Sequence, residues 1–250
     1  MTAIEVLALL GTGIAGGLAS TVASVASVVS YPALLAFGLP PLSANVTNTM
    51  SLVLTGAGSV LGSRPELAGQ RDRVLRLGLV SVFGGATGAA VLLLAPPAAF
   101  GLVVPVLIGA ASVVLLVQPM IGALSPRPDG ERSPRRLAGV FCAAVYIGYF
   151  GAAGGVLMVA LLGTMISESL IRLNALKNAI LGGANAVASV IFAVFAPVHW
   201  LFVPPLAVGF LIGGYTGPRL VRRLPVKALR LFVALCGLAL AAKLGVSAYR

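Results

Sequence analysis

The pentapeptide Gly-Gly-Ala-Thr-Gly at residues 84–88 returns as Gly-Gly-Tyr-Thr-Gly at residues 213–217, an offset of 129 residues. Matches outside the pentapeptide keep nearly the same register, with offsets of 129 or 130: Asn48 with Asn178, Ser59 with Ser189 and Pro96 with Pro225. Internal repetition at one fixed period indicates duplicated structural units. In a membrane protein, two similar halves are typical of secondary transporters.

The composition indicates a membrane protein throughout. Mean hydropathy is +1.06 and only 9% of the residues are charged, whereas about a quarter are charged in soluble domains. Apolar runs long enough to cross a bilayer recur along the whole chain. The first residues carry no basic region, so we expect no cleaved signal peptide. We predict an all-α membrane protein with about seven or eight hydrophobic segments.

The hydrophobic segments follow the same order in each half. We predict the segments 4–38, 43–62, 77–95 and 100–123, and then 137–167, 173–196, 200–218 and 228–248. The first of each set, 4–38 and 137–167, is too long for one simple span and is interrupted by Gly, Ser or Pro. Each repeat is therefore expected to contain one broken or re-entrant helical segment and three transmembrane helices.

Between the halves lies a polar linker. Residues 125–136 contain three prolines, a glycine and six charged residues, which is typical of a solvated connection. We expect a first transmembrane repeat at 1–124, a cytoplasmic linker at 125–136 and a second repeat at 137–250, all in one membrane domain. Both chain termini are then expected outside.

Basic residues predict that the repeats are inverted. A basic loop with Arg64, Arg71, Arg73 and Arg76 precedes the first pentapeptide helix, whereas the cluster around Arg223 follows the second. Arginine marks cytoplasmic loops, so equivalent helices should run in opposite directions. The alternative is eight simple spans, which fits the positions of Arg172 and Lys177 less well. The net charge of +11 is explained by this topology more simply than by an anionic partner.

Enzymatic chemistry is not indicated. The chain has one His and six acidic residues, with no Ser/His/Asp set. Its two cysteines form no CxxC motif and no Cys/His cluster. We therefore expect neither a metal nor a cofactor, and no catalytic residue.

The broken segments are the best candidates for a binding site. Residues 150–155, Phe-Gly-Ala-Ala-Gly-Gly, lie in the middle of the second one. Glycine allows positive φ and close backbone approach, and a half-helix that starts here presents free N–H groups to an anion. Gly151, Gly154 and Gly155 are thus candidate substrate-binding residues. Close helix packing through small residues explains the same motif equally well.

The equivalent stretch of the first half, residues 20–27, has serines in place of glycines. The hydroxyls of Ser24 and Ser27 are candidate donors to an oxyanion. The alternative is that they bond to their own helix backbone.

At these motifs the chain resembles the TauE/SafE family of sulfite and sulfonate exporters, whose halves each carry a GxGGG break, a proline about five residues on, a short loop and a helix with a polar start. Residues 151–155 give Gly-Ala-Ala-Gly-Gly, and Ala160 stands where proline is usual. The first half keeps Pro32, the loop 38–41 and the polar opening 45–51, and has Val-Ala-Ser at 25–27 in place of the glycines. The resemblance extends over essentially the whole chain.

The resemblance implies a multi-pass plasma-membrane carrier for sulfur oxyanions or organosulfonates, working as a secondary transporter, with export as the expected direction. A dianion in a low dielectric needs compensation. The available groups are the helix N-termini, Asn48, Asn178 and Lys177. Lys177 has an alternative role, in which it only extends to the cytoplasmic interface.

Two other functions stay open from the sequence: a passive anion channel and a membrane scaffold without transport. The expected partners are a small anionic substrate and the lipid bilayer, with no nucleic acid. Association with further copies of the chain stays an open alternative.

Overall fold

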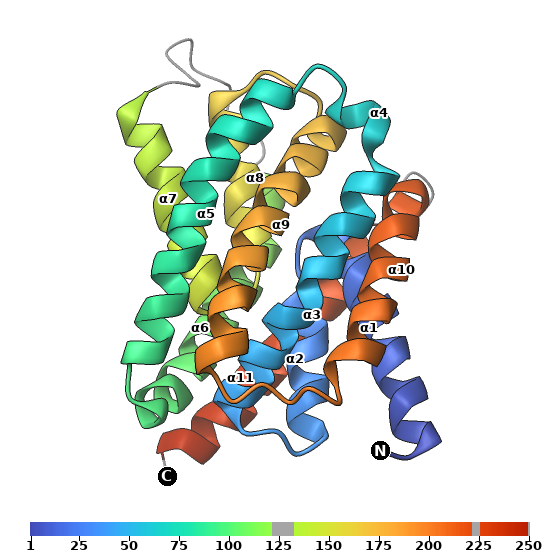
Figure 1. Ribbon diagram of the computed structural model, residues 1–250, viewed down its shortest axis with the longest axis vertical. Coiled ribbons are helices and arrows are strands. Elements are labelled where there is room, and N and C mark those ends of the chain that lie inside the picture. Colours follow the sequence, from blue (N-terminus) through green and yellow to red (C-terminus); the bar gives the residue numbers. More distant parts are fainter. Residues whose placement is uncertain (122–132, 222–225, 250) are drawn as a thin grey trace.

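The computed structural model describes residues 1–121, 133–221 and 226–249, and within these ranges the chain is built from helices, without strands (Figure 1). The helices of the first half are α1 (Ala3–Ala23), α2 (Ala26–Ala36), α3 (Pro41–Gly62), α4 (Arg64–Leu67), α5 (Arg71–Leu94) and α6 (Pro97–Ile121). Those of the second half are α7 (Pro134–Tyr149), α8 (Gly154–Met165), α9 (Leu170–Phe195), α10 (Val203–Val221) and α11 (Val226–Tyr249). The all-α prediction is confirmed.

Two predicted boundaries differ from the observed ones. The basic stretch after α3 is not a plain loop, because α5 begins at Arg71 and takes in Arg73 and Arg76. Asp72 in its first turn favours this start, since acidic side chains stabilise a helix N-terminus. The linker also ends earlier, with Pro134 at the first helical position of α7. Most of the linker and the cluster around Arg223 lie outside the described residues.

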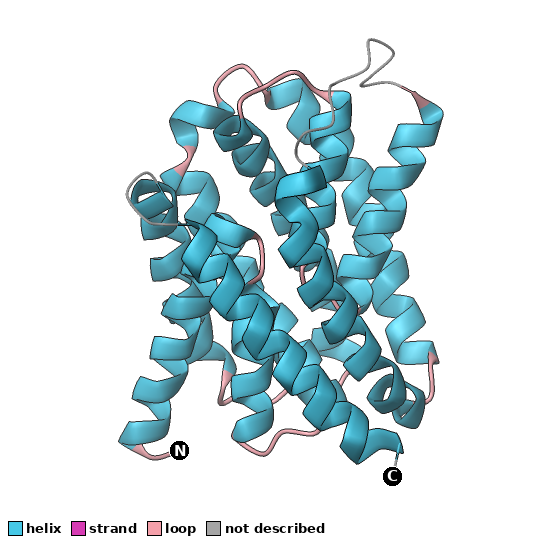
Figure 2. Cartoon of the chain, turned by 180° about the vertical axis from the view of Figure 1, so that it is seen from behind, coloured by secondary structure: helices cyan, strands magenta, loops and turns pink. Residues whose placement is uncertain are grey.

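The second half repeats the first with the direction reversed. In Figure 1, α3 rises from the lower end of the molecule to the upper end, and its counterpart α9 descends. The helices that carry the glycine pentapeptide, α5 and α10, are likewise opposed. Figure 2 shows the two marked termini at the same end. The predicted inverted arrangement is therefore present in the helix directions.

The glycine pentapeptides allow helices of one half to pack closely against helices of the other half. Helix α10 packs against α1 and α3 of the first half, and α5 packs against α7 and α9 of the second. A Cβ at Gly214 would lie 2.7 Å from the carbonyl oxygen of Thr55, and one at Gly85 would lie 2.8 Å from that of Ala184. These contacts leave no room for a side chain, so the repeated glycines serve close packing of equivalent helix pairs.

Both long apolar segments are broken into helical hairpins. Helices α2 and α8 have 11 and 12 residues, so each is about 17 Å long, roughly half of the hydrocarbon thickness. Eight simple spans are therefore not what the chain forms. The breaks contain Ser24 and Ala153, the two described non-glycine residues with positive φ, 62° and 52°. Their spacing is 129 residues, the period of the repeat.

The exterior suits a lipid environment. Large apolar side chains are exposed along the outer faces of α5 and α9, among them Leu79, Phe83, Val190 and Val194. Over the described ranges, three helices are both long and apolar enough to cross a bilayer by length and composition: Ala3–Thr21, Arg71–Leu94 and Leu170–Phe195. Shorter apolar helices accompany them, including α2 and α8.

One end of the molecule is basic. The starts of α4, α5, α7 and α9 all lie at the upper end in Figure 1. The basic residues of these starts are Arg64, Arg71, Arg73, Arg76, Arg135, Arg136 and Arg172. Glu168, before α9, pairs there with Arg73 at 2.9 Å and with Arg172 at 3.0 Å. These ion pairs tie α5 to the α8–α9 connection. The orientation of this end in the cell stays a prediction from the arginine content.

Candidate functional site

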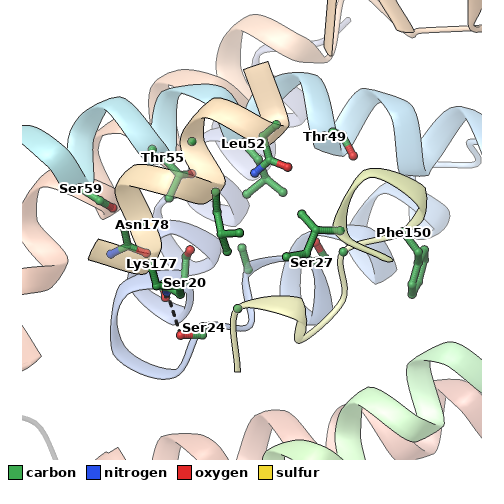
Figure 3. A pocket seen from close by; sticks show the side chains of 18 residues that line it. Ser20, Ser24, Ser27, Thr49, Leu52, Thr55, Ser59, Phe150, Lys177 and Asn178 are labelled. Carbon is green, nitrogen blue, oxygen red and sulfur yellow. Dashed lines mark hydrogen bonds between the residues drawn. The ribbon is translucent and has the colours of Figure 1, made fainter. Parts of the chain in front are cut away.

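A cavity of about 50 Å³ lies where the two helix breaks meet α3 and α9 (Figure 3). Its wall combines hydroxyl, amide and glycine positions from both halves of the chain. The lining residues are Ser20, Ser24, Ala26, Ser27, Thr49, Leu52, Thr55, Gly56, Ser59, Ile147, Phe150, Gly151, Gly155, Lys177, Asn178, Leu181, Gly182 and Asn185.

The first break turns the start of α2 toward this cavity. Helix α1 ends at Ser24, whose left-handed conformation lets its N–H bond to the carbonyl oxygen of Ser20 at 3.0 Å. Helix α2 follows at once, and its first residues, Ala26 and Ser27, line the cavity. Its N-cap residue, Val25, makes no side-chain hydrogen bond. The first N–H groups of α2 thus lack the usual side-chain cap.

The second break has the same form. Gly151 has φ 74° and Ala153 has φ 52°, and the N-cap Ala153 gives α8 no side-chain cap. The hydroxyl of Tyr146 donates to the carbonyl oxygen of Ala152 at 2.7 Å and holds the turn in place. Two uncapped half-helices therefore begin at one cavity, each with a partial positive charge at its start.

Gly155 brings the two breaks into contact. A Cβ on this residue would lie 2.9 Å from Cβ of Ser24 and 3.3 Å from Cδ of Lys177. Gly155 is in helical conformation, so its need for glycine comes from this close approach. The positive φ expected for the motif is instead at Gly151.

Lys177 on α9 is buried, with 1% of its surface exposed. Its Nζ donates to Oγ of Ser24 at 2.8 Å and to the carbonyl oxygen of Ser20 at 3.3 Å (Figure 3). Asn174, one turn earlier, donates to the carbonyl oxygen of Thr21 at 2.7 Å. The lysine thus lies at the C-terminus of α1, where a cation is favoured. The interfacial role considered for Lys177 is wrong, because its ammonium group bonds inside the protein.

Three further polar groups of the wall have no hydrogen-bond partner among the described residues. They are Oγ1 of Thr55, Oγ of Ser59 and Nδ2 of Asn178. All three side chains are buried. Buried polar groups are nearly always paired, so these groups are suited to a ligand.

Asn48 lies behind the wall. Its Nδ2 donates to Oγ of Ser27 at 3.1 Å, and its Oδ1 accepts from Oγ of Ser30 at 2.6 Å. Both serines belong to α2, so Asn48 fixes the start of this half-helix against α3. Its contacts make it a positioning residue for Ser27.

Most of the residues proposed from the sequence come together here. Ser24, Ser27, Gly151, Gly155, Lys177 and Asn178 line the cavity, while Asn48 and Gly154 do not. Gly154 packs against the side chain of Ile147 in its own hairpin. The role of all eight residues in substrate binding stays a prediction.

Sequence reasoning missed several polar residues of the wall and its support. On α3, Thr55 and Ser59 are four residues apart; on α9, Asn174, Asn178 and Asn185 have spacings of four and seven. Such spacings place side chains on one helix face. A polar stripe in an otherwise apolar helix was the signal that could have found them.

Aromatic side chains close the cavity beyond Phe150. The ring of Phe150 packs edge-on against Tyr31, with centroids 5.4 Å apart, and against Phe100 at 5.9 Å. Phe100 also packs on Tyr149 at 5.8 Å. Asn45 donates to the carbonyl oxygen of Tyr149 at 3.0 Å and links this cluster to α3.

The chemistry of the wall favours an anion. Lys177 is the one basic residue among the described lining residues, and none of them is acidic. Among the described residues, no three or more His, Cys, Asp or Glu side chains lie together where they could hold a metal ion. Donors and positive helix ends therefore dominate the cavity.

Comparison with known proteins gives a consistent result. The family model "Sulfite exporter TauE/SafE" matches residues 9–244. "Probable membrane transporter protein YfcA" of Escherichia coli (strain K12) is 23% identical over 232 residues, covering 91% of this chain and 85% of that protein. "Probable membrane transporter protein ORF9" of Sinorhizobium sp is 22% identical over 229 residues, covering 91% and 87%. No solved structure matches the chain.

Proposed function

Since the chain belongs to the sulfite exporter TauE/SafE family, and is therefore a membrane-embedded transporter, we propose that it carries a small sulfur-containing anion such as sulfite, thiosulfate or an organosulfonate. The substrate binds in the cavity between the two helix breaks. Transport proceeds by alternating access across the plasma membrane, with export as the direction.

The observation that carries this proposal is the convergence of three positive groups. The starts of α2 and α8 each contribute about half an elementary charge, and the Lys177 ammonium contributes one more. The C-terminus of α1 beside Lys177 offsets about half a charge, so the net is roughly one and a half positive charges, which favours an anion. In a membrane interior such compensation decides whether an anion can be held at all.

Alternating access is supported by the inverted repeats. Transporters of this architecture bind substrate near the midplane, at broken helices, and rock one repeat against the other. The aromatic cluster at Phe150 closes one side of the cavity. The Lys177 and Asn174 contacts to α1 lie at the other break. In this proposal, one set of contacts breaks to open the cavity to one side of the membrane, while the other set stays formed and keeps the opposite side closed.

The test is sulfite flux in proteoliposomes that contain the purified full chain. We expect saturable flux, which a passive channel would not give and a scaffold would not produce at all. Lys177→Met keeps the length of the side chain and removes its charge, so the flux should fall to the background of empty liposomes. Lys243→Met is the matched control, because Lys243 is exposed on α11. Unchanged, saturable flux in Lys177→Met would overturn the proposed site.

A further inference from the structure

We propose that Thr55, Ser59 and Asn178 make the site selective for compact inorganic sulfur oxyanions, such as sulfite and thiosulfate, over amine-bearing sulfonates such as taurine. This inference rests on the proposed function and narrows its substrate class. It assigns three side chains, from α3 and α9, as specificity-determining residues for transport.

The first argument is the set of unused hydrogen-bonding groups. Oγ1 of Thr55, Oγ of Ser59 and Nδ2 of Asn178 are buried and have no partner among the described residues. An unpaired buried polar group is costly, so each of them gains from a ligand atom. Nδ2 is a donor only, and hydroxyl groups readily donate. A ligand covered with acceptor oxygens pairs all of them.

The second argument is size. A water molecule needs roughly 10–15 Å³ of cavity space by this measure, so a cavity of about 50 Å³ holds roughly three to five waters. A sulfur atom with three or four substituents occupies about this space. An organic chain attached to the sulfur requires further movement of the wall. Leu52 and Leu181 in that wall come from α3 and α9, which pack closely against each other at Gly56 and Gly182.

The third argument is charge. The ammonium group of taurine is best compensated by a carboxylate, and none of the described lining residues is acidic. It would also meet the like charge of Lys177 in the same cavity. Like charges at close range in a low dielectric are strongly unfavourable. An inorganic oxyanion carries no positive group and is therefore not repelled by Lys177.

Competition in the flux assay tests selectivity without any substitution. Labelled sulfite is the transported probe, and unlabelled thiosulfate, taurine and sulfoacetate are the competitors. We expect thiosulfate to inhibit at concentrations near the KM for sulfite. Taurine should need at least a hundredfold more, and sulfoacetate, which lacks the amine but carries an organic chain, should fall between them. Equal competition by taurine and thiosulfate would overturn the inference and leave the transporter assignment intact. Absence of flux for sulfite, thiosulfate and sulfoacetate alike would instead overturn the proposed function.

Substitutions then test the three side chains. Thr55→Val and Ser59→Ala remove single hydroxyls at nearly constant shape, and each should raise KM for sulfite about threefold to tenfold with little change in maximal rate. Thr87→Val and Ser112→Ala are matched controls, because those hydroxyls bond to their own helices away from the cavity. Asn178→Asp places a carboxylate in the wall and should abolish sulfite flux. Wild-type KM in all three cavity variants, with folding verified by size-exclusion chromatography, would refute the assignment.

Discussion

Replacing Gly155 with alanine tests whether the contact between the two helix breaks builds the binding site. The new Cβ would lie 2.9 Å from Cβ of Ser24, whereas carbon atoms in favourable contact are about 3.5–4.0 Å apart. The breaks must therefore separate by roughly 0.6–1 Å. Overpacking of this kind costs about 1–3 kcal/mol. Valine adds further methyl groups close to Lys177 and should have a larger effect.

The assay is thermal unfolding of the purified protein with and without sulfite. Since a bound ligand raises the apparent Tm, we expect Gly155→Ala to lower the Tm and to reduce the sulfite-induced shift. Gly163→Ala, in the same helix, is the control, because its Cβ would lie 3.9 Å from the nearest atom, on Leu173. That variant should gain stability, by about 0.5–1 kcal/mol. A Gly155→Ala protein with wild-type Tm and sulfite shift would show that the reasoning is wrong.

Two further predictions concern the helix breaks, and a third concerns the topology. Ser24→Ala should weaken sulfite affinity by about 0.5–1.5 kcal/mol, less than Gly155→Val, as isothermal titration would measure; the reverse order would contradict the role of the glycine. Asn48→Leu should impair flux while expression stays normal, because Ser27 and Ser30 lose their partner; an unchanged flux would make Asn48 a packing residue. In a variant without native cysteines, an impermeant thiol reagent added to intact cells should label Val198→Cys and not Ala68→Cys; labelling at residue 68 from outside would reverse the topology.

Much of the fold was predictable because it depends on local and periodic properties of the chain. The lengths of the apolar runs set the helices, and Ser, Gly and Pro within residues 4–38 and 137–167 indicated the breaks. The basic loop precedes the pentapeptide helix in the first half and follows it in the second, which indicated that the two repeats are inverted in the membrane. The residues that take the left-handed conformation were not predictable, since Ser24 and Ala153 are not glycines. Ser24 lies against Gly155 of the other hairpin and accepts a hydrogen bond from Lys177, so packing and not intrinsic preference holds its conformation.

The contacts of the candidate site were less accessible from the sequence. The bond between Lys177 and the carbonyl oxygen of Ser20 joins residues 157 positions apart. It exists only because α9 is rotated to present this face to the end of α1. Helical periodicity predicts which residues share a face, but it does not say which neighbour that face meets. The burial of Lys177 was therefore undecided until the packing was known.

The same limit explains why Asn48 and Asn178, equivalent by the repeat, have different roles. Asn48 is paired with Ser27 and Ser30 of α2. The start of α8 has Gly-Gly-Val at residues 154–156 where α2 starts with serine-bearing sequence, and these side chains offer no hydrogen bond. Nδ2 of Asn178 has no hydrogen-bond partner among the described residues, and its side chain lines the cavity. The two asparagines therefore differ in their hydrogen bonding: Asn48 is a structural amide, and Asn178 is a candidate binding group.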